Sequence, residues 1–213
     1  LLNNNLISNY DAAYMASNIE IKKLNKPIGR QDHFISSSGN INCFKFYDQN
    51  NKIDKLELDE TKYRFLRNLT KRLYLIPSFI SRSADKVLYQ LKDSDSAKDD
   101  LLHIRNLADD FINLRDERDY IIEEAFNNCI KESWEIKQKM SGVMTGILSD
   151  QYNELKKLPL HWIRLLGAGS GGYFLISSKL DNEKTEEELT NIGIKDFFKA
   201  NLSMEGSEII HHT

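Results

Sequence analysis

Four of the chain's ten glycines lie within six residues, at Gly167, Gly169, Gly171 and Gly172. Apolar runs flank them on both sides. Glycines at this density bring backbone N–H groups together with no Cβ in the way. Such a nest of donors suits an anion, and phosphate is the usual one. A tight hairpin is the alternative, but two glycines would satisfy it, so the pattern favours a phosphate- or ligand-binding loop.

The spacing of Gly167, Gly169 and Gly172 also fits G-x-G-x-x-G. A dinucleotide-binding fold requires a helix to open at the third glycine. The residues that follow, Tyr173–Ser178, are aromatic and apolar and predict a strand instead. No Gly-Lys-Ser/Thr follows the glycines, so the P-loop pattern also fails.

A carboxylate and two cations are further candidates for chemistry. Asp32 lies between a glycine turn and a helix-like segment, where an acidic side chain could serve only to stabilise the helix N-terminus. Arg82 lies near the start of a helix expected over 81–91, where the dipole disfavours a cation, so an anionic partner or an ordinary surface position is expected. Lys137 follows Trp134 on a long helix and is expected in solvent unless a ligand lies nearby.

Composition places limits on the function. The 213 residues are 40% hydrophobic and 29% charged, as in soluble globular proteins. The net charge of −3 favours neither nucleic acid nor an anionic membrane as partner. No apolar run approaches the roughly 18 residues of a membrane span, and the five histidines show no metal-ligand spacing. Two cysteines, Cys43 and Cys129, are too few for a disulfide framework, which favours a cytoplasmic location.

Hydrophobic periodicity predicts an α+β fold, in which helices pack on one antiparallel sheet. Ser8 is expected to cap a helix that runs to Leu24. The other expected helices cover residues 61–68, 81–91, 99–114, 120–140, 148–158 and a short segment from 185. Strands are expected at 41–47, 53–58, 73–76 and 173–178. Alternation from Phe198 to Met204, a turn at 205–206 and a returning segment at 208–210 predict a terminal hairpin.

Several of these stretches resemble the GHMP small-molecule kinases, the superfamily of galactokinase, homoserine kinase, mevalonate kinase and phosphomevalonate kinase. The stretch 167–172 resembles their C-terminal glycine motif, and 27–33 looks like the segment that carries their catalytic aspartate. Stretches 80–84, 132–137 and 204–207 are similar to the D-glycero-D-manno-heptose phosphate kinase branch. The resemblance runs in order along nearly the whole chain.

The resemblance implies an ATP-dependent sugar kinase that uses Mg²⁺. Asp32 would be the catalytic base. Five residues would bind the substrate: Gly29, Arg30, Gln31, Arg82 and Lys137. The phosphate loop comprises Gly167, Ala168, Gly169, Ser170, Gly171 and Gly172. The acceptor would be the anomeric hydroxyl of a heptose 7-phosphate or a similar sugar, with Arg82, Arg30 and Lys137, in that order, as the cations for its phosphate.

The resemblance also implies a division into two domains. Residues 1–76 would be the remaining part of the N-terminal domain, and 77–213 the ferredoxin-like C-terminal domain.

The sequence departs from the family pattern at several places. The family's Pro-x-x-x-Gly-Leu-Gly-Ser-Ser loop, which wraps the ATP phosphates and is expected to supply Mg²⁺ ligands nearby, does not occur in these residues. Serine occupies position 170, where glycine is common, and Ile76–Phe79 replaces a Tyr-Thr-Gly.

Because the upstream loop is missing, the chain is expected to be a fragment that does not turn over ATP by itself. A non-catalytic domain that kept the fold for ligand binding or interaction is the alternative to a kinase.

Overall fold

A computed structural model of the chain describes residues 7–47, 52–81, 88–89, 95–116, 118–140 and 142–208. Contacts within the chain define two compact units, one of residues 1–63 with 202–213 and one of residues 64–201. The division between these units falls before the strand at 73–77, whereas the family resemblance predicts a domain boundary between residues 76 and 77, which stays a prediction.

The first unit begins with α1, Asn9–Asn18, which is capped as its sequence predicts. The Ser8 hydroxyl accepts a hydrogen bond from the Asp11 N–H at 3.1 Å and donates one to the Asp11 carboxylate at 2.6 Å. The chain then continues as a π-helix, η1, over Ile19–Lys23. The predicted end at Leu24 is correct, but the wider π turn was not predicted, and such turns often mark functional sites.

A second helix and a hairpin complete this unit. Helix α2 spans Gln31–Ser38, and strands β1, Cys43–Phe46, and β2, Ile53–Leu56, pair antiparallel. The turn predicted between them lies largely outside the described residues.

Phe34 of α2 forms the centre of the first unit's core, with only 1% of its surface exposed. The rings of Tyr10, Phe44 and Phe46 meet it edge-on, with centroids 5.2, 5.6 and 5.7 Å away. This aromatic cluster joins α1, α2 and the hairpin, and so fixes the helix that carries Asp32.

The C-terminal segment corrects the sequence prediction. Strand β6 covers only Phe198–Lys199, and the described residues 202–208 form no hairpin. The segment instead lies against the end of α2, where the Asn40 N–H donates to the Ser203 carbonyl at 2.7 Å and the Ser207 N–H donates to the Ser37 carbonyl at 3.2 Å.

Two glycines explain why this segment lies where it does. A Cβ on Gly206 would collide with the Ser37 carbonyl, and one on Gly39, whose φ is +60°, would collide with the Glu205 backbone. The apolar alternation from Phe198 onward was misleading because Met204 remains half exposed.

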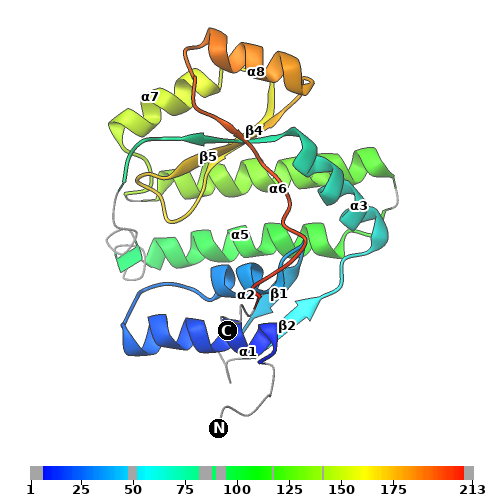
Figure 1. Cartoon of the computed structure of the whole chain (residues 1–213), viewed down its shortest axis with the longest axis vertical. Coiled ribbons are helices and arrows are strands. Elements are labelled where there is room, and N and C mark those ends of the chain that lie inside the picture. The colour runs from blue at the N-terminus through cyan, green and yellow to red at the C-terminus, as the bar shows by residue number, and fades with distance from the viewer. Residues whose placement is uncertain are drawn as a thin grey trace, which may run out of the picture. The chain divides into compact units, whose positions relative to one another are not determined.

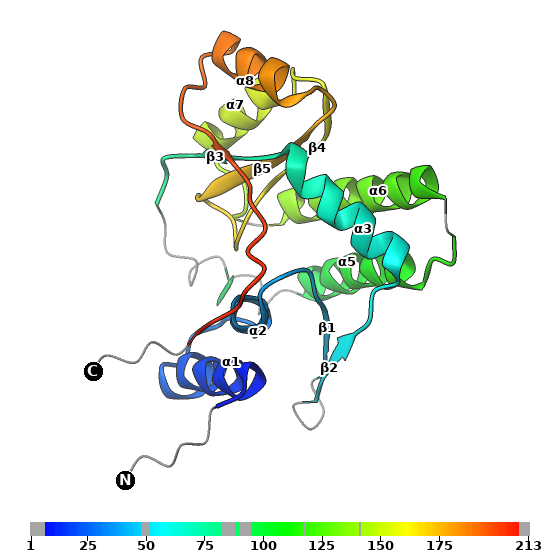
Figure 2. The same ribbon diagram turned by 45° about the vertical axis from the view of Figure 1, so that its right-hand side comes forward.

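The second unit is a four-stranded antiparallel sheet with helices on both faces (Figures 1 and 2). Its elements, in chain order, are α3 (Glu60–Leu69), η3 (Thr70–Arg72), β3 (Leu73–Pro77), α5 (Asp95–Asn113), α6 (Asp119–Lys139), α7 (Gly146–Leu155), β4 (Leu160–Leu165), β5 (Tyr173–Ser178), α8 (Asn182–Asn191) and β6. Most of the helix predicted over 81–91 lies outside the described residues.

The strand order is β4-β5-β3-β6. Helices α7 and α8 lie on one face in both views, and α5 and α6 lie on the other. Successive side chains of β5 point to opposite faces of the sheet. Phe174 and Ile176 lie in the core on one face, and Leu175 packs against the core on the other. The α+β prediction is confirmed, and the sheet carries the glycine loop at one end.

Candidate functional site

The glycine loop, 166–172, joins β4 to β5, which are adjacent antiparallel strands. The Leu166 N–H donates to the Tyr173 carbonyl at 2.9 Å, which closes the loop. A strand follows Gly172, as predicted, so the loop does not have the strand–turn–helix context of a dinucleotide-binding turn.

Two of the four glycines are required by the chain's own backbone. A Cβ on Gly169, whose φ is +111°, would lie 2.7 Å from the Val143 Cα, and a Cβ on Gly171 would collide with the Ile80 carbonyl oxygen. Gly167 differs, because nothing lies within 4 Å of its missing Cβ, although its φ is +76°. A ligand would therefore meet the loop most openly at Gly167.

Some donors of the loop are already in use. The Ser170 N–H donates to the Val143 carbonyl at 2.8 Å, and the Gly172 N–H donates to the Ile80 carbonyl at 3.1 Å. The Ser170 hydroxyl also donates inward, to the Gly142 carbonyl. Among the described residues, the N–H groups of residues 167, 168, 169 and 171 have no backbone partner and could meet a phosphate.

Lys137 lies beside this loop, 30 positions earlier in the sequence. Its ammonium group donates to the Gly167 carbonyl oxygen at 2.5 Å. Because a trans peptide points its C=O and N–H in opposite directions, the Ala168 N–H points away from Lys137. Lys137 thus fixes the orientation of one potential phosphate donor.

A cleft of about 640 Å³ opens beside the loop, and Gly167, Ala168 and Gly169 line it. Its other lining residues include three exposed aromatic residues and one carboxylate: Phe79, Tyr173, Phe198 and Asp196. The aromatic side chains leave apolar surface open to a ligand, while the loop offers backbone N–H donors.

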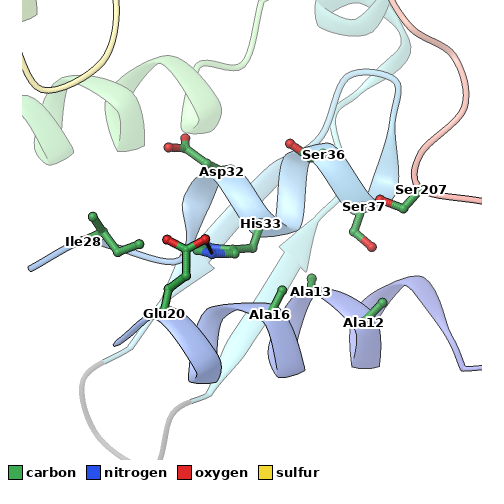
Figure 3. A pocket seen from close by; sticks show the side chains of 10 residues that line it. All are labelled: Ala12, Ala13, Ala16, Glu20, Ile28, Asp32, His33, Ser36, Ser37 and Ser207. Carbon is green, nitrogen blue, oxygen red and sulfur yellow. Dashed lines mark ion pairs between the residues drawn. The ribbon is translucent and has the colours of Figure 1, made fainter. Parts of the chain in front are cut away.

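Asp32 belongs to the first unit and is exposed in the first turn of α2, a position that both the catalytic and the helix-start predictions allow. It lines a cavity of about 550 Å³ together with Ser36 and Ser207 (Figure 3). In that view its carboxylate points away from the ion pair between His33 and Glu20, whose Nε2 and Oε1 lie 3.6 Å apart.

The other predicted substrate residues near Asp32 do not line its cavity. Gly29 and Arg30 line a separate cavity of about 250 Å³ with Tyr47 and Lys52. The Arg30 guanidinium lies over the Tyr14 ring, 5.1 Å from its centroid.

The two remaining predicted substrate residues differ in what the structure shows of them. Gln31 is exposed as the first residue of α2. Arg82 lies outside the described residues.

Comparison with known structures identifies the fold. Mevalonate kinase from Methanococcus jannaschii matches 93% of this chain and 58% of its own, at 18% identity and a TM-score of 0.68. Galactokinase from Lactococcus lactis matches 98% and 63%, at 12% identity and a TM-score of 0.61. The chain has the GHMP kinase fold.

A D-glycero-D-manno-heptose 1-phosphate kinase from Bacteroides thetaiotaomicron matches 96% of this chain and 57% of its own, at 16% identity and a TM-score of 0.54. No protein-family model and no curated protein sequence matches the chain. The chain spans about three-fifths of the length of the GHMP kinases it matches.

The ligand groups of a GHMP kinase fit the described residues to different degrees. The glycine loop fits a phosphate, because it combines an open Gly167 with N–H groups that line a cleft. No group of three or more His, Cys, Asp or Glu side chains in the described parts of the chain could hold a metal ion. Likewise, no described helix is long and apolar enough to cross a membrane.

Two features of these sites were not predicted. The Glu20–His33 pair was missed because the π-helix that presents Glu20 has no simple sequence signature. Asp196 was missed because it reaches the loop cleft only through the pairing of β6 with β3, more than 100 positions away.

Proposed function

We propose that this chain is part of a GHMP-type phosphotransferase that moves a phosphoryl group from ATP to a hydroxyl group of a small molecule. The observation that carries the proposal is the glycine loop between β4 and β5, which lines an open cleft in a chain with this fold. In this setting the loop's backbone donors would stabilise charge on phosphate oxygens.

In the proposed reaction Asp32 acts on the acceptor. Its exposed carboxylate would orient the substrate hydroxyl and take its proton as the oxygen bonds to phosphorus and the bond to the departing ADP breaks. The first turn of α2 leaves this carboxylate exposed, so that a substrate hydroxyl could reach it.

The loop and Lys137 would contribute by positioning. Phosphoryl transfer asks for alignment and charge stabilisation rather than covalent chemistry by the protein. Lys137 holds the Gly167 carbonyl, which leaves the Ala168 N–H directed to the other side of the loop. ATP would supply the transferred group.

The finer proposal is a cytoplasmic sugar kinase that acts on the anomeric hydroxyl of a heptose 7-phosphate or a similar sugar. It rests on the motifs at 80–84, 132–137 and 204–207, with Arg82 as the first cation for the sugar phosphate. The fold match offers it no extra support, since the mevalonate kinase scores higher than the heptose kinase.

The test is a phosphotransfer assay on the polypeptide that contains this chain, with ATP and a panel of sugars and sugar phosphates. Asp32→Asn should lower turnover by about 100-fold or more while nucleotide affinity stays unchanged. Glu57→Gln, which alters another exposed carboxylate of the first unit, is the matched control and should keep full turnover. Near-normal turnover in Asp32→Asn would contradict the catalytic role.

A non-catalytic binding domain is the alternative. Its supporting observation is that the N–H groups of Ser170 and Gly172 already serve the chain's own carbonyls. This alternative predicts that sugar phosphate binds at the loop while no substrate in the panel is phosphorylated. Any Asp32-dependent transfer would exclude it.

A further inference from the structure

The cleft beside the glycine loop contains a carboxylate that the proposed phosphoryl transfer does not use. Asp196, just before β6, is exposed and lines this cleft. It is the one charged side chain among the described residues that line it. A negative charge in the same cleft as a proposed phosphate-binding loop needs a separate explanation.

The charge of Asp196 indicates which part of a ligand can lie beside it. An ionised carboxylate has no proton to donate and only accepts hydrogen bonds. It therefore repels phosphate and suits hydroxyl groups, which donate to it in short, charge-assisted bonds. The lining of the cleft thus combines hydrogen-bond donors, on the glycine loop, with a hydrogen-bond acceptor, the Asp196 carboxylate.

Strand pairing places two aromatic residues of the cleft, Tyr173 and Phe198, on either side of β3. Tyr173 of β5 pairs with Pro77, and Phe198 of β6 pairs with Leu75. Positions 75 and 77 share a face of β3, and paired residues of antiparallel strands project to the same side of the sheet. Tyr173 and Phe198 therefore flank β3 on one face.

The exposure of these rings favours a ligand rather than internal packing. Tyr173 is 45% exposed, Phe198 is 56% exposed, and Phe79, beyond the end of β3, is 77% exposed. Flat apolar rings beside a hydrogen-bond acceptor suit a molecule with C–H surface on one side and hydroxyl groups at its edge.

We infer that Asp196, Tyr173 and Phe198 form a subsite for the uncharged, polyhydroxylated part of the acceptor, with phosphate groups confined to the glycine-loop end. This inference rests on the proposed function and adds a specificity-determining residue to it. A site built to bind hydroxyl groups also discriminates against analogues that lack them, because its acceptor is then left unpaired.

The experiment measures binding of two probes separately, D-mannose as the uncharged polyol and ADP as the phosphate ligand, by titration followed with NMR. Asp196→Asn should weaken D-mannose binding by about 10-fold, since a charge-assisted hydrogen bond becomes a neutral one. ADP affinity should stay equal or rise slightly, because a repelling charge is removed. Phe198→Leu should also weaken D-mannose and leave ADP unchanged.

Glu187→Gln is the control, since it removes an exposed carboxylate on α8 away from the residues that line the cleft. Unchanged D-mannose affinity in Asp196→Asn, or no D-mannose binding by the unaltered protein, would overturn the subsite while ADP binding leaves the proposed function standing. If neither probe binds, both the subsite and the proposed function fail.

Discussion

The ammonium group of Lys137 donates a hydrogen bond to the Gly167 carbonyl oxygen across 2.5 Å and so ties the last turn of α6 to the glycine loop. The two residues are 30 positions apart in sequence. This contact orients the peptide that follows Gly167, and it gives a lysine on a long amphipathic helix a specific role at the candidate phosphate site.

Replacing Lys137 should therefore lower the affinity of the loop for phosphate more than it lowers the stability of the fold. Lys137→Met should weaken binding of a phosphate ligand by about 3- to 10-fold, because the Gly167–Ala168 peptide loses its charge-assisted anchor. The unfolding free energy should fall by no more than about 1 kcal/mol, since the contact is partly exposed. ADP titration and denaturant unfolding measure the two effects.

Lys139→Met is the matched control, because Lys139 lies in the same last turn and loses the same favourable interaction with the helix C-terminus. Equal loss of ADP affinity in both variants would show that the effect is general electrostatics rather than the contact with Gly167.

The glycines of the loop should separate into two classes. Gly169→Ala and Gly171→Ala should each lower the unfolding free energy by about 2 kcal/mol or more, because a Cβ would strike the backbone at Val143 or Ile80. Gly167→Ala should cost only about 1 kcal/mol, from its positive φ. Thermal unfolding checks the order, and an equal cost at all three positions would contradict these backbone contacts.

The crossing of the C-terminal segment over α2 gives a prediction for the first unit. Gly206→Ala should destabilise this unit by about 2 kcal/mol or more, since its Cβ has no room beside the Ser37 carbonyl. Gly29→Ala is the control, because nothing lies within 4 Å of its missing Cβ. The hydrogen-exchange rate of the α2 amides should rise in Gly206→Ala and not in Gly29→Ala. Unchanged exchange in Gly206→Ala would contradict the packing of the C-terminal segment against α2.

The parts that the sequence predicted correctly depend on neighbouring residues. Ser8 caps α1 through Asp11, three residues later, and the aromatic run after Gly172 forms β5. Both patterns act within one element, so periodicity and capping chemistry suffice to identify them.

The features that the sequence did not predict depend on contacts between residues distant in sequence. Within the described residues 202–208 the predicted terminal hairpin is absent, because the chain after β6 turns to meet Ser37 of α2 and Asn40 just beyond it. Residues 209 and 210 of that prediction lie outside the described residues. For the same reason, the packing of Gly169 against Val143 and the place of Asp196 in the cleft were not predictable from the sequence. The four glycines form the loop between β4 and β5, where Gly169 and Gly171 pack against the backbone at Val143 and Ile80. The phosphate-binding role of this loop stays a prediction.

A buried tyrosine predicts how stability depends on pH. Tyr74 is fully buried and donates to the Glu186 carboxylate at 3.1 Å, and burial, followed by this hydrogen bond and the nearby negative charge, raises its pKa from 10.0 to about 12. The stabilisation is therefore complete below pH 10 and is lost as the pH rises toward 12, because the unfolded tyrosine ionises first.

Tyr74→Phe removes this titration. The unaltered protein should lose more unfolding free energy between pH 9 and about pH 11.5 than the variant does, as measured by urea unfolding at both values. Parallel losses in the two proteins would show that Tyr74 titrates normally in the folded state.

The central claim, that the glycine loop binds phosphate through its backbone, is tested most directly by titrating ¹⁵N-labelled protein with ADP and, separately, with a sugar phosphate. Donors that bind phosphate shift strongly in the amide spectrum, so we expect the largest changes at Gly167, Ala168, Gly169 and Gly171, and small changes at Ser170 and Gly172, whose N–H groups already have partners. Saturation with both ligands that leaves the amides of Gly167, Ala168, Gly169 and Gly171 unshifted would contradict the claim.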